Sequence, residues 1–278
     1  MSGILFVVAT PIGNLEDLTP RARQTLASVD LVAAEDTRHT RRLLITIGAK
    51  PALIALHDHN EERAVQGIIE ALNDGKDVAL VSDAGTPLVS DPGFRLVRAA
   101  HEQSITVVPL PGPSAVTAAL SAAGLPTDRF CFEGFPPSKS AARREWLKNL
   151  AAETRTIVIY EAVHRISASL ADMVEIFGAD RQAFIGRELS KMHEQCVQDS
   201  LGDLRRMVDD GDITSKGEFV VVVSGAPAAA ASSIDSERLL VELSSCLSAK
   251  DAARIAANIT GEKKNALYER LIQLKAQQ

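Results

Sequence analysis

The sequence predicts an α/β fold: two α/β domains, a cofactor cleft between them, and a small helical element at the C-terminal end. Over roughly the first hundred residues, short continuous apolar runs alternate with amphipathic helical patterns, which is typical of a parallel sheet covered on both faces. Farther along, two expected strands lie too close together for a crossover helix, so the second sheet should include antiparallel pairs. The residues from 235 onward show only helical patterns. A chain of 278 residues is long enough for about two such domains.

The first domain is expected to span 1–122 and to alternate strands with helices. Its expected strands are 4–9, 31–34, 52–56, 78–81 and 105–108. Thr19 followed by Pro20 is an N-cap and a first-turn proline, and this pair opens the first helix. Over 60–75 the apolar residues recur at helical spacing, and a further helix is expected over 90–102. This order of elements predicts a parallel sheet with helices on both faces.

The second domain is expected to span 123–228. A loop over 111–124, which includes a helix rich in small residues, leads into it. Its expected strands are 129–133, 156–160, 182–187, 194–198 and 218–223, and its expected helices are 138–150 and 163–177. Because 182–187 and 194–198 are so close in sequence, we expect them to pair in an antiparallel way. Trp146 lies on an amphipathic helix and is expected in the core.

The C-terminal helical element is expected over 233–278, after a linker at 226–233 with the low complexity of Ala-Pro-Ala-Ala-Ala-Ala-Ser-Ser. Its expected helices are 235–246, 250–258 and 262–274. A turn at Gly261 separates the last two helices, which suits a helix-turn-helix arrangement. Two roles stay open for this element: a packing or dimer element, and a contact to nucleic acid.

The composition narrows the classes of protein. A formal net charge of −6 argues against polyanion binding over the whole surface, but leaves room for a local basic patch. No secretion signal opens the chain, and the longest uncharged run, 219–234, is too short and too often interrupted to cross a membrane. The three cysteines form no C-x-x-C pair and show no zinc-ligand spacing. We therefore expect a cytoplasmic protein without a metal or a membrane segment.

Three loops that follow strands are the expected place for chemistry, since ligands of parallel sheets bind at the carboxyl ends of the strands. They are 9–14, 82–87 and 109–115. The first has one glycine where a dinucleotide fingerprint needs three, which disfavours NAD. Asp83 in the second loop can accept from a ribose or an amine, and Ser114 in the third stands at a helix start that can face a ligand. The alternatives are an ordinary turn for the second loop and a rigid hinge for the third.

Six motifs in order carry a resemblance to a known family. They are Ala-Thr-Pro-Ile-Gly-Asn-Leu (9–15), Glu-Asp-Thr-Arg (35–38), Ser-Asp-Ala-Gly-Thr-Pro (82–87), Pro-Gly-Pro-Ser-Ala (111–115), Tyr-Glu-Ala-Val-His-Arg (160–165) and Gly-Arg-Glu-Leu-Ser-Lys (186–191). The chain resembles the tetrapyrrole-methylase-like, class III S-adenosylmethionine-dependent methyltransferases over essentially its whole length. It departs at Ala162, where a small polar residue is expected.

The resemblance implies an enzyme that binds S-adenosylmethionine (SAM) in the cleft between its two α/β domains. It further implies methylation of the ribose 2′-hydroxyl of a cytidine in the decoding region of 16S rRNA, by a homodimer that acts on the small ribosomal subunit without a metal. The cofactor residues that it implies are Pro11, Ile12, Gly13, Asp83, Gly85, Thr86, Ser114 and Ala115 of the first domain and Ile159, Tyr160 and Glu161 of the second.

A ribose hydroxyl is a poor nucleophile, so a general base within hydrogen-bond reach would assist its methylation. The candidate catalytic residues on the facing loops are Asp36, Glu161, Glu188 and His193, with Lys191 or Arg187 as electrostatic alternatives. For each of them, a structural ion pair or an RNA contact stays open as the other interpretation.

A basic stretch is the expected RNA contact. It contains Arg38, His39, Arg41 and Arg42, and the motif residues Arg165 and Arg187 are added to it. Lys139, Arg143 and Arg144 are expected to extend this patch, while an ordinary solvated helix face is the alternative. The stretch 57–59, His-Asp-His, resembles a metal cluster, but alternate residues of a strand end point apart.

Two other functions stay open. One is a SAM methyltransferase of the same fold that acts on a tetrapyrrole or another small molecule. The other is a noncatalytic RNA-binding or ribosome-assembly factor. The basic stretch and the C-terminal helices favour RNA over a small substrate, and the intact loops 83–87 and 111–115 favour catalysis.

Overall fold

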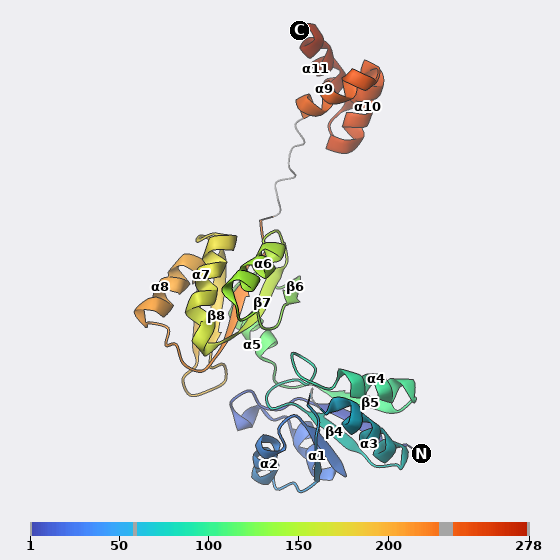
Figure 1. Cartoon of the computed structure of the whole chain (residues 1–278), viewed down its shortest axis with the longest axis vertical. Coiled ribbons are helices and arrows are strands. Elements are labelled where there is room, and N and C mark those ends of the chain that lie inside the picture. The colour runs from blue at the N-terminus through green and yellow to red at the C-terminus, as the bar shows by residue number, and fades with distance from the viewer. Residues whose placement is uncertain (1, 58–59, 228–235, 277–278) are drawn as a thin grey trace. The chain divides into compact units, whose positions relative to one another are not determined.

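The computed structural model describes residues 2–57, 60–227 and 236–276. It divides into two compact units, Met1–Gly225 and Ala226–Gln278, and both β-sheets belong to the first unit. Of the linker expected over 226–233, residues 228–233 lie outside the described residues. Figure 1 shows the elements of each unit along the chain.

The first sheet is fully parallel, with the strand order β3-β2-β4-β1-β5. Its strands are β1 (Ile4–Val8), β2 (Leu31–Ala34), β3 (Ala52–Ala55), β4 (Val78–Val81) and β5 (Thr106–Leu110). One face is covered by α1 (Pro20–Ser28) and α2 (Thr37–Thr46), and the other by α3 (Glu61–Asn73) and α4 (Phe94–Glu102). The continuous apolar strands therefore predicted this doubly covered sheet correctly.

Two of the helices that cover the first sheet differ from those expected; below, each sheet with its covering helices is called a layer. Helix α2 was not expected, because its sequence is dominated by basic residues; it begins where the Asp36 carboxylate accepts from the backbone N–H of Arg38, and it buries Thr40 and Leu44. Helix α4 begins four residues later than expected. The segment before it holds Leu88 and Ser90 at φ of 72° and 70°, values that a right-handed helix excludes. The expected start at Thr19 and Pro20 is confirmed, with the Thr19 side chain accepting from Ala22.

The second sheet is mixed, with the strand order β6-β7-β10-β8-β9. Its strands are β6 (Phe130–Phe132), β7 (Thr156–Ala162), β8 (Gln182–Arg187), β9 (Gln195–Ser200) and β10 (Glu218–Val223). Only β6 and β7 are parallel, and the expected antiparallel pairing of β8 with β9 is confirmed.

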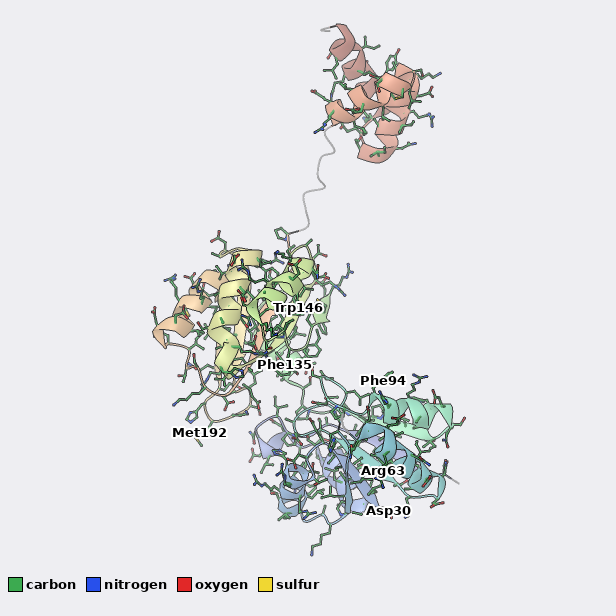
Figure 2. The ribbon with its side chains drawn as sticks, viewed as in Figure 1. Asp30, Arg63, Phe94, Phe135, Trp146 and Met192 are labelled. Carbon is green, nitrogen blue, oxygen red and sulfur yellow. The ribbon has the colours of Figure 1, made fainter. Side chains whose placement is uncertain are left out.

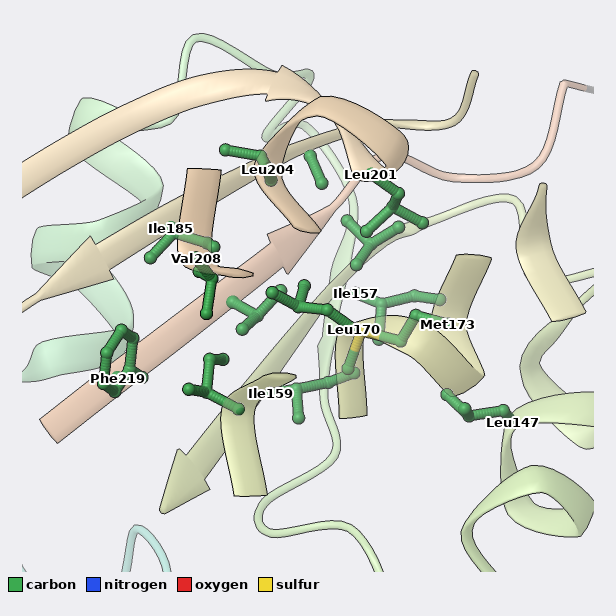
Figure 3. Packing of buried hydrophobic residues seen from close by; sticks show 14 of the residues in the cluster. Leu147, Ile157, Ile159, Leu170, Met173, Ile185, Leu201, Leu204, Val208 and Phe219 are labelled. Atoms are coloured by element: carbon green, nitrogen blue, oxygen red, sulfur yellow. The ribbon is translucent and has the colours of Figure 1, made fainter. Parts of the chain in front are cut away.

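Helices cover both faces of the second sheet. Helix α5 (Ala115–Ala122) packs on one face, and α6 (Ser140–Leu150), α7 (Ile166–Phe177) and α8 (Leu201–Asp210) pack on the other. Figure 3 shows the second of these interfaces, where Leu170 and Met173 of α7 lie over Ile157 and Ile159 of β7. Trp146 is partly buried and packs against this cluster. Helix α8 was not expected from the sequence; its N-cap is Ser200, whose hydroxyl oxygen accepts from the backbone N–H of Asp203.

A buried ion pair joins α6 to α7. The Arg143 guanidinium donates from Nε and Nη2 to Asp172 Oδ2 at 2.7 and 2.6 Å, and the Ser140 hydroxyl donates to the same carboxylate. The side chains of Arg143 and Asp172 are only 3% and 10% exposed. The expectation that Arg143 extends a surface patch was therefore wrong: its charge is neutralised inside the second layer.

The second unit contains α9 (Ser236–Cys246), α10 (Ala249–Thr260) and α11 (Lys264–Ala276), which pack through a small core of leucines and alanines. Gly261 ends α10 in a left-handed conformation, as the expected turn requires. Within the part of the chain that the structure describes, no helix is both long and apolar enough to span a bilayer.

Candidate active site

One cavity lies where loops from the carboxyl ends of the first sheet meet strand ends of the second. Its volume is about 510 Å³, within the range of roughly 300–1,000 Å³ usual for small-molecule sites. Ile12 and Val89 from the first layer pack against the apolar cluster beneath α5, which joins the two layers beside the cavity. Figure 2 labels Phe135, one of the second-layer residues that line it.

Backbone and side-chain hydrogen bonds hold the three expected loops together. Thr10 and Gly85 exchange backbone hydrogen bonds of 2.8 and 3.0 Å, which ties the first loop to the second. The Thr86 hydroxyl donates to the carbonyl of Pro113 at 3.0 Å, which ties the second loop to the third. Gly85 has a φ of 83°, and a Cβ there would lie 3.3 Å from the Ile12 side chain. The sequence therefore folds these loops into one rigid cavity floor.

Most residues expected to bind a cofactor surround this cavity. Those that line it are Ile12, Asp83, Gly85, Thr86, Ser114, Ala115, Tyr160 and Glu161. Pro11 and Gly13 lie in the same first loop without lining the cavity, and Ile159 is fully buried in the core of the second layer. The carboxyl end of β7 therefore reaches the cavity through Tyr160 and Glu161, the two residues that follow Ile159.

Asp36 is occupied as a helix cap. Its carboxylate accepts from the backbone of Arg38 at 2.8 Å and forms a two-point ion pair with the Arg38 side chain, at 3.1 and 2.7 Å. The hydrogen bonds from Arg38 hold the pKa of Asp36 well below its ordinary value. The backbone N–H of Asp36 donates to Asp83 Oδ1 at 3.1 Å, so Asp83 links the loop after β4 to the loop after β2. As a persistent anion, Asp36 is poorly suited to accept a proton.

Glu161 is occupied in a buried ion pair. Its side chain is fully buried, and Oε1 accepts from Arg165 at 2.9 Å and from the backbone of Ala162 at 2.7 Å. The Ser169 hydroxyl donates to the other oxygen. Arg165 is 17% exposed and also donates to the carbonyl of Pro136. Both expected functional residues therefore hold the start of α7 against the end of β7.

Glu188 and Lys191 form a network with Glu218. Lys191 Nζ lies 2.8 Å from Glu188 and 3.1 Å from Glu218. Burial alone would raise the pKa of Glu188, but the hydrogen bonds from Lys191 and from the Glu218 backbone outweigh it and place that pKa below its ordinary value. Burial alone would lower the pKa of Lys191, but the hydrogen bonds to its two partners place it above the ordinary value. Both groups therefore stay charged.

The segment that carries Glu188 and Lys191 lies over the first loop. A Cβ at Gly13 would fall 2.2 Å from Lys191 Cγ, so only glycine allows this approach. The Ser190 hydroxyl donates to Asp17 on the short 3-10 helix after the first loop. Met192, labelled in Figure 2, is 92% exposed on this segment. Lys191 thus covers the first loop of the cavity floor.

Arg187 faces the protein interior. It is 6% exposed, and it donates to the carbonyls of Lys216 at 2.6 Å and of His193 at 2.9 Å. A third hydrogen bond reaches the Gln195 side chain at 3.0 Å. Arg187 therefore orders the segment that carries Glu188 and Lys191, while His193 contributes its backbone carbonyl.

Sequence reasoning missed Asp91, which lines the cavity together with Glu35 and Asp83. Burial raises the pKa of Asp91 to about 6, and the negative charges of Glu35 and Asp83 add to the effect. The motif 82–87 was recognised, but Asp91 lies beyond it on a segment that was expected to be helical. Its sequence signal was the Asp-Pro-Gly run at 91–93, which is typical of a turn.

The basic stretch forms the exposed face of α2. Arg38, His39, Arg41 and Arg42 are all exposed, and Arg38 is held by Asp36. Within the described chain, Arg41 and Arg42 form no ion pair. Of the stretch 57–59, two residues lie outside the described residues, and among the residues that the structure places no cluster of three His, Cys, Asp or Glu side chains is arranged to hold a metal.

Comparison with known proteins defines the class. A family model described as Tetrapyrrole (Corrin/Porphyrin) Methylases matches residues 5–205, and one described as RsmI C-terminal HTH domain matches 230–275. The fold is similar to that of a diphthine synthase, with a TM-score of 0.60 and 16% identity over 80% of this chain and 90% of that chain. It is also similar to the methyltransferase CobJ, with a TM-score of 0.59 and 20% identity over 81% and 95%. These identities show the fold alone. The class is therefore the tetrapyrrole methylases.

Relatives at higher identity narrow this class. Ribosomal RNA small subunit methyltransferase I of Xylella fastidiosa is 51% identical over 96% of this chain and 98% of its own length. The protein of that name from Escherichia coli O157:H7 is 50% identical over 96% and 94%. The chain therefore belongs to the ribosomal RNA small subunit methyltransferase I family, and it is a methyltransferase.

Proposed function

We propose that the protein transfers a methyl group from SAM to the ribose 2′-hydroxyl of a cytidine in the decoding region of 16S rRNA. The observation that carries the proposal is the cavity of about 510 Å³ in a chain that matches rRNA methyltransferases over nearly its full length. The exposed arginines of α2 supply a basic surface in the same unit. The proposed partner is the small ribosomal subunit, and the proposed enzyme is a cytoplasmic homodimer.

The cavity lining fits SAM. Glu35 and Asp83 place carboxyl groups in it, which suits a ligand that carries a sulfonium and an ammonium group. Phe135 and Tyr160 provide an aromatic wall, with their rings 5.5 Å apart and edge to face, against which an adenine can pack. When bound, SAM supplies a methyl group on a positively charged sulfur.

The protein's own residues then have two tasks. The loops tied by Thr10, Gly85 and Thr86 fix the position of the ligand, and the apolar wall of Phe219 and Val220 limits water in the cavity. Correct alignment of two reacting groups in this way is worth up to roughly 7–11 kcal/mol of the activation barrier. The exposed Arg41 and Arg42 attract the phosphates of the RNA.

The proposed function is tested by transfer of labelled methyl from SAM to small ribosomal subunits that lack their native modifications. Naked 16S rRNA serves as the parallel substrate. Alkaline cleavage of RNA requires a free 2′-hydroxyl, so the methylated position is mapped by its resistance to alkali. We expect label at one alkali-resistant cytidine of the decoding region. Binding of SAM without transfer to either RNA substrate would contradict the proposal and favour a small-molecule substrate. Absence of SAM binding would favour a noncatalytic RNA-binding factor.

Asp83→Asn is expected to weaken SAM binding about tenfold, because charge-assisted hydrogen bonds contribute roughly 1.5–3 kcal/mol. Asparagine keeps an acceptor for the Asp36 backbone N–H, so the loop connection is retained. Titration calorimetry with SAM measures the effect. Wild-type affinity in this variant would remove Asp83 from the set of cofactor ligands.

Arg41→Glu is expected to weaken binding of the small subunit and to reduce the slope of log affinity against log salt by about 1, because one phosphate contact is lost. Affinity for SAM should not change. Arg63→Glu is the matched control, since Arg63 is also exposed but lies on α3, which covers the opposite face of the sheet. Equal losses of RNA affinity in both variants would show a general charge effect and contradict the assignment of α2.

A further inference from the structure

Asp91 occupies an unusual place in the backbone. It lines the cavity on the segment between β4 and α4, where Leu88 and Ser90 have φ of 72° and 70° and Gly93 has φ of 125°. Positive φ at non-glycine residues costs free energy, and such conformations persist only where the surroundings enforce them. They gather at functional sites for that reason. The fold therefore maintains unfavourable backbone conformations in the segment that places Asp91 at the cavity.

The charges around Asp91 are almost all negative. Glu35, which follows β2, and Asp83, which follows β4, both act on Asp91. Tyr160 of β7 also lines the cavity; burial is the main cause that raises its pKa to about 12, and the negative charge of Asp91 contributes. Glu218 of β10 also lines the cavity and acts on Tyr160 in the same direction. The neighbouring Ser82 side chain opposes these charges and lowers the pKa of Asp91, but burial outweighs it. No lysine, arginine or histidine of the described chain forms an ion pair with it.

The other carboxyl groups considered for catalysis are each committed elsewhere. Asp36 caps α2 and pairs with Arg38, Glu161 pairs with Arg165 inside the second layer, and Glu188 pairs with Lys191. If one of these carboxylates accepted a proton, it would lose its negative charge, and its ion pair would be weakened. Asp91 differs because it lines the cavity without a cationic partner, and burial brings its pKa to about 6, close to the working range of a general base.

We propose that Asp91 is the general base that accepts the proton of the ribose 2′-hydroxyl during methyl transfer, an inference that rests on the function proposed above. The hydroxyl oxygen forms a bond to the methyl carbon while the bond from that carbon to sulfur breaks, and the bonding electron pair stays on sulfur. The hydroxyl proton passes to the Asp91 carboxylate and then to solvent. The products are the 2′-O-methyl ribose, S-adenosylhomocysteine and one proton.

Asp91→Asn is the test, with Asp91→Glu as the conservative variant and Asp74→Asn as the matched control. Asp74 is exposed at the end of α3 and lies outside the cavity. We expect Asp91→Asn to lower kcat about 100-fold or more, since general-base catalysis contributes roughly 10²–10⁴-fold. Its affinity for S-adenosylhomocysteine, measured by titration calorimetry, should stay within about threefold of wild type, which also shows that the cavity is folded. Asp91→Glu should recover part of kcat.

The pH profile separates catalysis from a structural role. Only the ionised carboxylate accepts a proton, so the wild-type rate should rise as the pH passes through about 6 and level off above it. In Asp91→Asn the residual rate should lose this limb, whereas Asp74→Asn should keep it. A variant Asp91→Asn with wild-type kcat and the same pH limb would overturn the inference. So would a variant that loses affinity for S-adenosylhomocysteine while kcat at saturation is unchanged, because Asp91 would then be a cofactor ligand.

The proposed function fails in a different way. If the wild-type protein binds SAM but methylates neither the subunit nor naked 16S rRNA, both proposals are overturned together. If the wild type methylates the ribose and Asp91→Asn does so equally fast, only the role of Asp91 is overturned.

Discussion

Replacing Asp172 with alanine is expected to lower the free energy of unfolding of the first unit by about 3–5 kcal/mol, because a buried charge that loses its partner is strongly destabilising. Arg143 would keep its position inside the second layer, only 3% exposed, with its two short hydrogen bonds to the carboxylate removed. The Ser140 hydroxyl would lose its acceptor as well. All three groups lie on α6 or α7, so the loss should fall on the packing of these two helices.

The measurement is denaturant unfolding of the full chain, followed by the fluorescence of Trp146. It is the one tryptophan of the sequence, and it lies on α6 against the same core. Glu145→Ala is the control, because Glu145 forms an ion pair with Lys148 in which both side chains are more than half exposed. Such a pair contributes about 0–1 kcal/mol. Equal losses in the two variants would refute a special cost of the buried pair.

Gly85→Val is expected to reduce the affinity for S-adenosylhomocysteine about 10- to 100-fold, which corresponds to the roughly 1–3 kcal/mol that overpacking costs. Gly85 lines the cavity at a φ of 83°, and even a Cβ there would lie 3.3 Å from the Ile12 side chain. The two further methyl groups of valine would either enter the cavity or push Ile12 into it.

Gly48→Val separates this steric effect from backbone strain. Gly48 has a similar φ of 74°, but a Cβ there would meet nothing within 4 Å. Both variants should therefore lose stability through backbone strain in denaturant unfolding, Gly85→Val more than Gly48→Val because it is also overpacked, while only Gly85→Val should lose affinity in titration calorimetry. Equal affinities in the two variants would show that Gly85 does not shape the ligand site.

Much of this fold is predictable because burial leaves a direct mark on the sequence. Strands covered on both faces need continuous apolar residues, and β4 shows this in four consecutive buried residues. Helix α2 escaped prediction because only Thr40 and Leu44 are buried, so its basic face hides the apolar repeat. Its N-cap, Asp36, was instead weighed as a general base, because the sequence alone does not distinguish a capping aspartate from a catalytic one.

The site is predictable only as far as it follows strand ends. Asp83 and Gly85 come directly after β4, so the topology of a parallel sheet places them. Asp91 reaches the cavity because positive φ values turn the chain back, and no periodic pattern encodes that turn. Charge alone also does not reveal burial: the partners Arg143 and Asp172 are far apart in sequence, and Arg187 finds its acceptors on backbone carbonyls.

The positive φ of Ser90 has a consequence for adaptation to heat. A left-handed conformation costs a residue other than glycine about 1–2 kcal/mol, so glycine at such a position stabilises the fold. Ser104 has a φ of 56° on an exposed turn before β5, away from the cavity. Adaptation to higher temperature can therefore use Ser104→Gly without a loss of catalytic activity. Ser90→Gly offers a similar gain but loosens the segment that positions Asp91. At that one position, selection for thermal endurance and selection for turnover oppose each other.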